Sequence, residues 1–111
     1  MKTIAVVSSI FAISATVAVA QMKMPDTPAS KGYEAAMSKM MSATKTMTMI
    51  GDPDKDFVMM MLPHHQGAID MAKVELEYGK DPMLKKMATE IIAAQQKEID
   101  AMKMWHSKAP M

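Results

Sequence analysis

The chain has 111 residues, half of them hydrophobic, with 13 basic and 12 acidic residues, 17 methionines and no cysteine. A net charge of +1 and the absence of arginine argue against nucleic acid as a partner, and no disulfide can stabilise the fold. A single small domain of this size depends on helix packing, oligomerisation or a bound ion for its stability.

Residues 1–20 have the pattern of a secretory signal peptide. Lys2 gives a positive start, an apolar run extends from Ile4 to Val19, and Ala18-Val19-Ala20 matches a signal peptidase site. Serine and threonine interrupt the run, so its apolar pieces are shorter than the roughly 20 residues that span a bilayer. We expect cleavage after Ala20 and a periplasmic or secreted protein without stable membrane insertion. A retained N-terminal anchor is the alternative.

Residues 21–30 contain two methionines among Pro, Asp, Thr, Ser and Lys without periodicity, which predicts a flexible tail. A first helix is predicted from Lys31 to Met47 with Ser30 as its N-cap. Its apolar stripe recurs at helical spacing and consists of Tyr33, Met37, Met40, Thr44 and Met47. The turn signal Gly51-Asp52-Pro53 follows this helix.

A second helix is predicted to end at Tyr78, with Asp52 or Asp54 as its N-cap. Gly79 stops it, and Asp81-Pro82 supplies the N-cap and first position of a third helix that ends near Ser107. The fold class is therefore all-α, an up-down three-helix bundle. The domain boundaries that follow are residues 31–107 for the bundle and 108–111 for a C-terminal tail.

Pro63 lies inside the second predicted helix and precedes two adjacent histidines. Because proline lacks an amide proton and its ring crowds the carbonyl of Met59, we expect the helix to bend or open there. At about 100° per residue, His64 and Met71 fall within about 20° of each other, while His65 lies among core positions. One histidine is predicted to enter the core and the other to border it.

Thioether and imidazole groups surround this proline. Thioether sulfur is soft and stays neutral, which suits monovalent copper or silver, and imidazole accepts either oxidation state of copper. Met102 and His106 are four residues apart and form a second candidate site. The full set of candidate metal ligands is Met61, His64, His65, Met71, Met60, Met40, Met37, Met102 and His106.

Packing explains part of the same pattern, because a methionine stripe ordinarily fills a core. His106, near the chain end, has the position of a solvated or capping residue, and Glu98 is expected at the rim of the apolar face, reaching toward a lysine. Met59 and Met104 lie outside the predicted core stripes, which indicates a protein interface or a metal contact. A methionine-rich interaction module without metal is thus the alternative to a metal-binding protein. An enzyme with a histidine-centred metal site is a third hypothesis, but the sequence shows no nucleophile and base pair.

Several motifs together resemble a known family. They are Gly51-Asp52-Pro53-Asp54-x-Asp56-Phe57, Met61-Leu62-Pro63-His64-His65-x-x-Ala68-Ile69-x-Met71-Ala72, Tyr78-Gly79-x-Asp81-Pro82 and Ile91-Ile92-x-x-Gln95-x-x-Glu98-Ile99. This combination is similar to the signature of the bacterial family called domain of unknown function 305. The similarity covers nearly the whole chain after the signal peptide.

The resemblance implies a ferritin-like helical bundle, usually exported, with some relatives tied to copper or silver binding and resistance. By position it supports Met61, His64, His65 and Met71 as ligands. A ferritin-like bundle has four helices where this chain has three, so a homodimer is expected to supply the fourth. The chain also lacks the Glu-x-x-His pairs of di-iron sites, so ferritin's oxidase chemistry is not expected.

The sequence therefore predicts an exported copper-binding protein without catalytic activity. It is expected to buffer Cu(I) or Ag(I), to confer resistance, or to deliver the metal to a copper-trafficking protein. Cu(II) is the alternative oxidation state. Exposed thioether ligands would allow the metal to exchange with such a partner, whereas a closed structural site would not.

Overall fold

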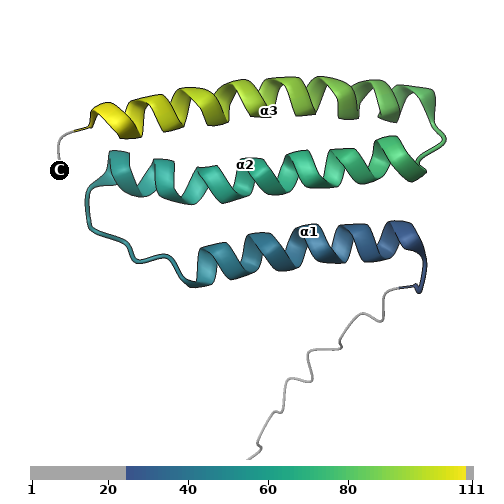
Figure 1. Ribbon diagram of the computed structural model, residues 1–111, viewed down its shortest axis with the longest axis horizontal. Helices are drawn as coiled ribbons and strands as arrows, with labels where there is room; N and C mark the ends of the chain where they lie inside the picture. The colour runs from purple at the N-terminus through teal and green to yellow at the C-terminus, as the bar shows by residue number, and fades with distance from the viewer. Residues whose placement is uncertain (1–24, 110–111) are drawn as a thin grey trace, which may run out of the picture.

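The computed structural model describes residues 25–109 and contains three helices there and no strand. They are α1 (Pro28–Lys45), α2 (Pro53–Tyr78) and α3 (Pro82–Lys108), and they run antiparallel to one another in chain order (Figure 1). The prediction of an all-helical, up-down three-helix architecture is confirmed. The predicted signal peptide, its cleavage position and residues 21–24 of the predicted tail lie outside the described residues, whereas residues 28–30 of that tail belong to α1.

Helix α1 begins earlier than its periodicity indicated. The Thr27 side chain accepts a hydrogen bond from the Ser30 amide at 3.1 Å, and Pro28 occupies the first helical turn. Thr27 is therefore the N-cap, and the prediction of Ser30 was wrong because proline is favoured just inside a helix start. The helix ends at Lys45, before the predicted Met47.

The starts of α2 and α3 follow the predicted caps. Asp52 accepts hydrogen bonds from the Asp54 and Lys55 amides, and Asp81 accepts one from the Leu84 amide. Asp52, and not Asp54, is thus the N-cap of α2. These bonds satisfy amide groups that have no partner within the first helical turn.

A buried carboxylate fixes the connection between α1 and α2. Asp56 is 7% exposed, and its two oxygens accept hydrogen bonds from the Ile50 amide at 2.9 Å and the Gly51 amide at 3.0 Å. The connection is therefore tied to the first turn of α2, which sets where α1 lies relative to α2.

Helix α2 is the middle element of the molecule. It packs against α1 on one side and α3 on the other, and within residues 25–109 no Cα atom of α1 lies within 8 Å of one in α3 (Figure 1). The three helices thus form a layer in which α2 has two flanks covered and two sides left open.

Helices α1 and α2 approach each other closely at two glycines. A Cβ atom at Gly32 would lie 2.9 Å from a methyl group of Val74, and one at Gly67 would lie 2.9 Å from the sulfur of Met40. Both distances are shorter than ordinary van der Waals contacts. Glycine at these positions therefore lets α1 lie against α2.

Pro63 does not open the helix. Helix α2 is continuous from Pro53 to Tyr78, and Figure 1 shows no break along it. The expectation of an opened helix was wrong, because the proline removes one amide donor while the packing of α1 and α3 on both flanks holds the remaining turns.

The two open sides of α2 differ in chemistry. Gly67 and Val74 mark the flank toward α1 and His65 the flank toward α3. At about 100° per residue, one open side carries Phe57, His64, Met71 and Glu75, and the opposite one carries Lys55, Gln66, Lys73 and Glu77. We call the first side the methionine face, formed by Phe57, Met60, His64 and Met71 of α2 with the adjacent side chains of α1 and α3.

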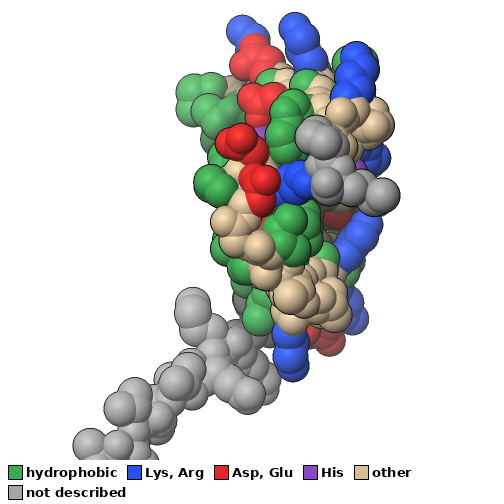
Figure 2. Space-filling view, turned by 90° about the vertical axis from the view of Figure 1, so that its left-hand side faces the viewer, with side chains coloured by type: hydrophobic (Ala, Val, Ile, Leu, Met, Phe, Trp, Pro, Cys, Tyr) green, Lys and Arg blue, Asp and Glu red, His purple; other side chains and the backbone are tan. Residues whose placement is uncertain are grey.

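The end-on view of the layer agrees with this division. In Figure 2, several hydrophobic side chains lie along the left-hand edge, and most of the visible basic side chains lie toward the right-hand and upper edges. This end of the layer therefore has a more apolar and a more basic edge.

The core of this layer is thin. Among the described residues its buried hydrophobic members are mostly small, and Ile69 is the only large side chain that is fully buried. Met37 of the predicted apolar stripe is 47% exposed, so its interpretation as core filling was wrong. A two-flank contact cannot enclose long side chains, because each helix meets at most two neighbours.

Candidate functional site

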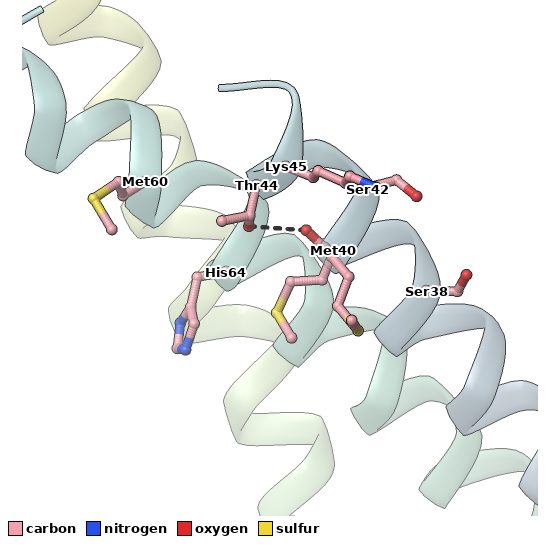
Figure 3. A pocket seen from close by; sticks show the side chains of 8 residues that line it. Ser38, Met40, Ser42, Thr44, Lys45, Met60 and His64 are labelled. Atoms are coloured by element: carbon pink, nitrogen blue, oxygen red, sulfur yellow. Dashed lines mark hydrogen bonds between the residues drawn. The ribbon is translucent and has the colours of Figure 1, made fainter. Parts of the chain in front are cut away.

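A hollow of about 710 Å³ opens on the methionine face between the C-terminal half of α1 and the middle of α2. Three thioethers and one imidazole belong to its lining, which consists of Ser38, Met40, Met41, Ser42, Thr44, Lys45, Met60 and His64. Figure 3 shows Met60 and His64 one turn apart on α2, with Met40 across the hollow on α1. Two helices thus bring soft donor groups to one place.

Among these donors, Met40 packs directly against the neighbouring helix. Its sulfur lies over Gly67, where a Cβ atom would come within 2.9 Å, and its carbonyl accepts a hydrogen bond from the Thr44 hydroxyl at 2.9 Å (Figure 3). Met60, by contrast, is 45% exposed. The hollow therefore combines one thioether held at the α1–α2 contact with donors that are open to solvent.

His64 is exposed and borders the hollow. Its ring meets that of His65 edge to face, with the centroids 6.3 Å apart, and within residues 25–109 no hydrogen bond or ion pair engages its nitrogens. An imidazole nitrogen without a protein partner can donate its lone pair to a metal ion.

His65 has a different environment. It is 8% exposed, its Nδ1 donates a hydrogen bond to the Met61 carbonyl at 2.9 Å, and its Nε2 donates to the Glu98 carboxylate of α3. The prediction that Glu98 reaches toward a lysine was wrong, because His65 is its partner. Coordination of a metal by His65 would require the loss of one of these bonds.

A second hollow lies between the start of α2 and the end of α3. Asp54, Phe57, Val58, Ala101, Met102 and Trp105 line it. Met102 is half-buried there, whereas His106 is exposed and is not part of the lining. Both residues lie on α3, one turn apart, and their role as a second metal site stays a prediction.

A third hollow joins all three helices at the other end of the layer. Its lining includes Tyr33 of α1, Met71 and Glu75 of α2, and Met87 of α3. Burial raises the pKa of Tyr33, and the negative charge of Glu75 and a hydrogen bond to it raise that pKa further.

The structure divides the predicted ligands among these places. His64 and Met71 share one side of α2, but seven residues separate them by about 10 Å along the axis, and they line different hollows. Met60 and Met40 join His64, whereas Met61 and Met37 line none of the three hollows. Within residues 25–109 no three His, Asp or Glu side chains are grouped as a metal site.

Two participants are hard to recognise in the sequence. Met41 lies about 100° from Met40 on α1 and therefore falls outside the apolar stripe, yet it lines the hollow. Glu98 stands 33 residues from His65, and only its position on an apolar face indicated that it needs a partner.

Comparisons with known proteins give a match to a family model and a similar viral protein. The chain matches the family model described as "Domain of unknown function (DUF305)" over residues 7–106. It is also similar to the uncharacterized protein L153 of Acanthamoeba polyphaga mimivirus, with 47% identity over 49 residues, which is 44% of this chain and 32% of that protein. The matched segment thus spans about a third of the length of that relative. No helix in the described part of the chain is both long and apolar enough to cross a membrane.

Proposed function

The chain belongs to the family described as domain of unknown function 305, and within this family we propose that it is an exported protein that binds a soft monovalent metal ion. The ion is Cu(I), with Ag(I) as a surrogate, and Cu(II) is the alternative. The protein buffers the metal, confers resistance to it or delivers it to a copper-trafficking partner, without catalytic activity.

The observation that supports this proposal is the convergence of Met40, Met41, Met60 and His64 on one hollow. Thioethers select soft cations, and an imidazole adds a stronger donor that tolerates either oxidation state of copper. The lining contains no carboxylate, which a hard cation such as calcium or magnesium would need. The donor set therefore fits copper or silver.

The exposure of the donors fits a carrier better than a permanent site. Met41 is 66% exposed and Met60 is 45% exposed, so a partner protein can reach an ion held there. A closed, fully coordinated site would release its metal slowly, whereas open thioether ligands can be replaced one at a time. Buffering and delivery need such exchange.

Anaerobic titration with Cu(I) against a competing chelator, repeated with Ag(I), tests this proposal. His64→Ala should weaken binding at least about tenfold, the lower limit for losing even a supporting partner of a metal ligand, while His106→Ala should not. Met41→Leu should weaken binding and Met83→Leu should not, since both methionines are 66% exposed but only Met41 lines the hollow. Equal affinities for all four variants would reject the site.

The exposed methionines also support the second candidate, an interaction module that binds protein without metal. Large apolar side chains that gather on a surface have unfavourable contacts with water, and such surfaces often mark a protein interface. The test compares the Cu(I) and Ag(I) affinities of the protein with those of a variant in which His64, His65 and His106 are replaced. Equal affinities would support the interaction module over the metal-binding protein.

A further inference from the structure

The methionine face is the uncovered side of the layer. Phe57, His64 and Met71 lie on one side of α2, and each of them lines a different one of the three hollows. All three hollows therefore open on the same face, with His64 near the middle of α2.

This face carries much of the exposed apolar surface. Six large hydrophobic side chains that line its hollows are at least 40% exposed, namely Met41, Met60, Phe57, Trp105, Leu84 and Met87. Large apolar side chains that gather on one exposed face mark an interaction site. The thin core, with Ile69 as its only fully buried large side chain among the described residues, indicates that covering this face would add much of the missing apolar burial.

We propose that the methionine face docks a second copy of this chain, face to face, and that the two layers close over the hollow around His64. The proposal goes beyond the proposed function, because the docking follows from the uncovered face whether or not metal binds. Only the effect of docking on metal affinity rests on the proposed function.

The size of the face fits a dimer. At 1.5 Å per residue, the 18 residues of α1 and the 27 residues of α3 extend over about 27 Å and about 40 Å. With helix axes about 8–10 Å apart, the layer presents roughly 500–800 Å². A standard interface buries about 800 Å² on each partner, so this face approaches what a stable dimer needs.

The charges on the face favour a second copy over a lipid surface. The charged residues that line the three hollows have both signs, Lys45, Asp54 and Glu75. A face that carried charges of one sign would repel an identical copy at every orientation, whereas a face with both signs need not. A helix face that lies on an anionic membrane instead carries lysines along its apolar border, and the other lysines of residues 25–109 line none of these hollows.

Closure by a second copy would cover the hollow at its centre, so exchange of the metal with a partner protein would follow dissociation of the dimer. His64 and Met60 would be buried between two copies, and thioethers from both could reach one ion. Metal binding and dimer formation would then strengthen each other, because each ligand favours the state that the other stabilises.

Sedimentation velocity of the purified protein, with and without Ag(I), tests the inference. We expect a dimer. Phe57→Glu and Met87→Glu should each raise the dimer dissociation constant at least tenfold, and Met104→Glu should leave it unchanged. Met104 is the matched control because it is 58% exposed, compared with 59% for Phe57, and lines none of the three hollows. Far-ultraviolet circular dichroism verifies that each variant keeps its helices.

A monomer under both conditions would overturn the inference, as would equal weakening by Met104→Glu. A monomer that floats with vesicles of anionic lipid would assign the face to a membrane instead. A monomer that binds Ag(I) contradicts only the docking of a second copy. A dimer that binds no Ag(I) supports the docking and contradicts the proposed function.

Discussion

His65 joins the two longest helices through Glu98. Its Nε2 donates to the Glu98 carboxylate, and its Nδ1 donates to the Met61 carbonyl one turn earlier in α2. The adjacent histidine, His64, has no such partner within the described residues and borders a hollow lined with thioethers. Neighbouring histidines thus have separate roles, one at a helix contact and one at the candidate metal site.

This division predicts that substitutions of the two histidines differ in their effect on stability. His65→Ala should lower the free energy of unfolding by about 1–3 kcal/mol, because it removes a nearly buried ring from the α2–α3 contact together with its hydrogen bond to the Glu98 carboxylate. His64→Ala should change it by less than about 0.5 kcal/mol, as is usual for an exposed position. Urea denaturation of both variants measures the difference. If His64→Ala is the more destabilising one, the assignment of roles is wrong.

Gly67→Ala should disturb the metal site without unfolding the protein. The new methyl group would lie 2.9 Å from the Met40 sulfur and 3.4 Å from its Cβ, so the thioether must move away from its seat. Alanine also gains up to about 1 kcal/mol over glycine inside a helix, which offsets part of the strain. We expect weaker Cu(I) binding with a nearly unchanged midpoint of thermal unfolding.

Gly32→Ala is the matched control for this substitution. Its methyl group would meet Val74, which is β-branched and stiff, at 2.9 Å. The stability should therefore fall while Cu(I) binding in the distant hollow persists. If Gly32→Ala abolishes metal binding and Gly67→Ala does not, the packing of the Met40 sulfur on Gly67 does not position a metal ligand.

Asp56→Ala should destabilise the fold by about 1–3 kcal/mol, because the amides of Ile50 and Gly51 would lose their buried acceptor. Asp54→Ala removes a carboxylate from the same helical turn. It should lower the free energy of unfolding by only about 0.3–1 kcal/mol, the contribution of a carboxylate that interacts with the helix dipole. Thermal unfolding followed by circular dichroism compares the two. Equal losses would show that the carboxylate of Asp56 acts through its charge alone.

The environment of Tyr33 predicts a loss of stability in alkali. Burial and the Glu75 carboxylate raise the pKa of Tyr33 above its ordinary value of 10.0. The folded state therefore holds the Tyr33 proton to a higher pH than the unfolded chain does. The contribution of this group to the free energy of unfolding is complete below pH 10.0 and is lost as the pH rises through the pKa of the folded state. Ultraviolet absorbance of the phenolate follows the titration.

Two glutamine variants separate the tyrosines in this titration. Glu75→Gln should lower the pKa of Tyr33. Glu77→Gln should act on Tyr78, whose pKa is raised chiefly by the charge of Glu77. A Glu75→Gln titration identical to that of the unmodified protein would reject the pairing of Tyr33 with Glu75.

Export makes a separate prediction that concerns residues outside the described range. If the signal peptide is cleaved after Ala20, the protein recovered from outside the cytoplasm should begin at Gln21. Intact mass spectrometry of the exported and the cell-associated fractions measures this. A full-length chain that remains in the membrane fraction would support the retained anchor instead.

The sequence alone determined the helices and the chemistry of their donors. Asp52, Asp81 and the prolines that follow them set the starts of α2 and α3 through hydrogen bonds within one turn, so the bounds could be predicted locally. The positions of Met60 and His64 one turn apart on α2, and of Met40 on α1, could likewise be predicted from helical periodicity within each helix. These features depend on neighbours a few residues away, which a linear pattern records.

The packing of the helices against one another sets which donors share a hollow. The register of α1 on α2, set by the approach of Met40 to Gly67, brings Met41 to His64 and leaves Met71 to a different hollow. The pairing of His65 with Glu98 and the lack of contact between α1 and α3 likewise arise from how separate helices pack. Contacts between residues distant in the chain depend on side-chain shape across an interface, and helical periodicity gives the direction of a side chain but not the neighbour that it meets.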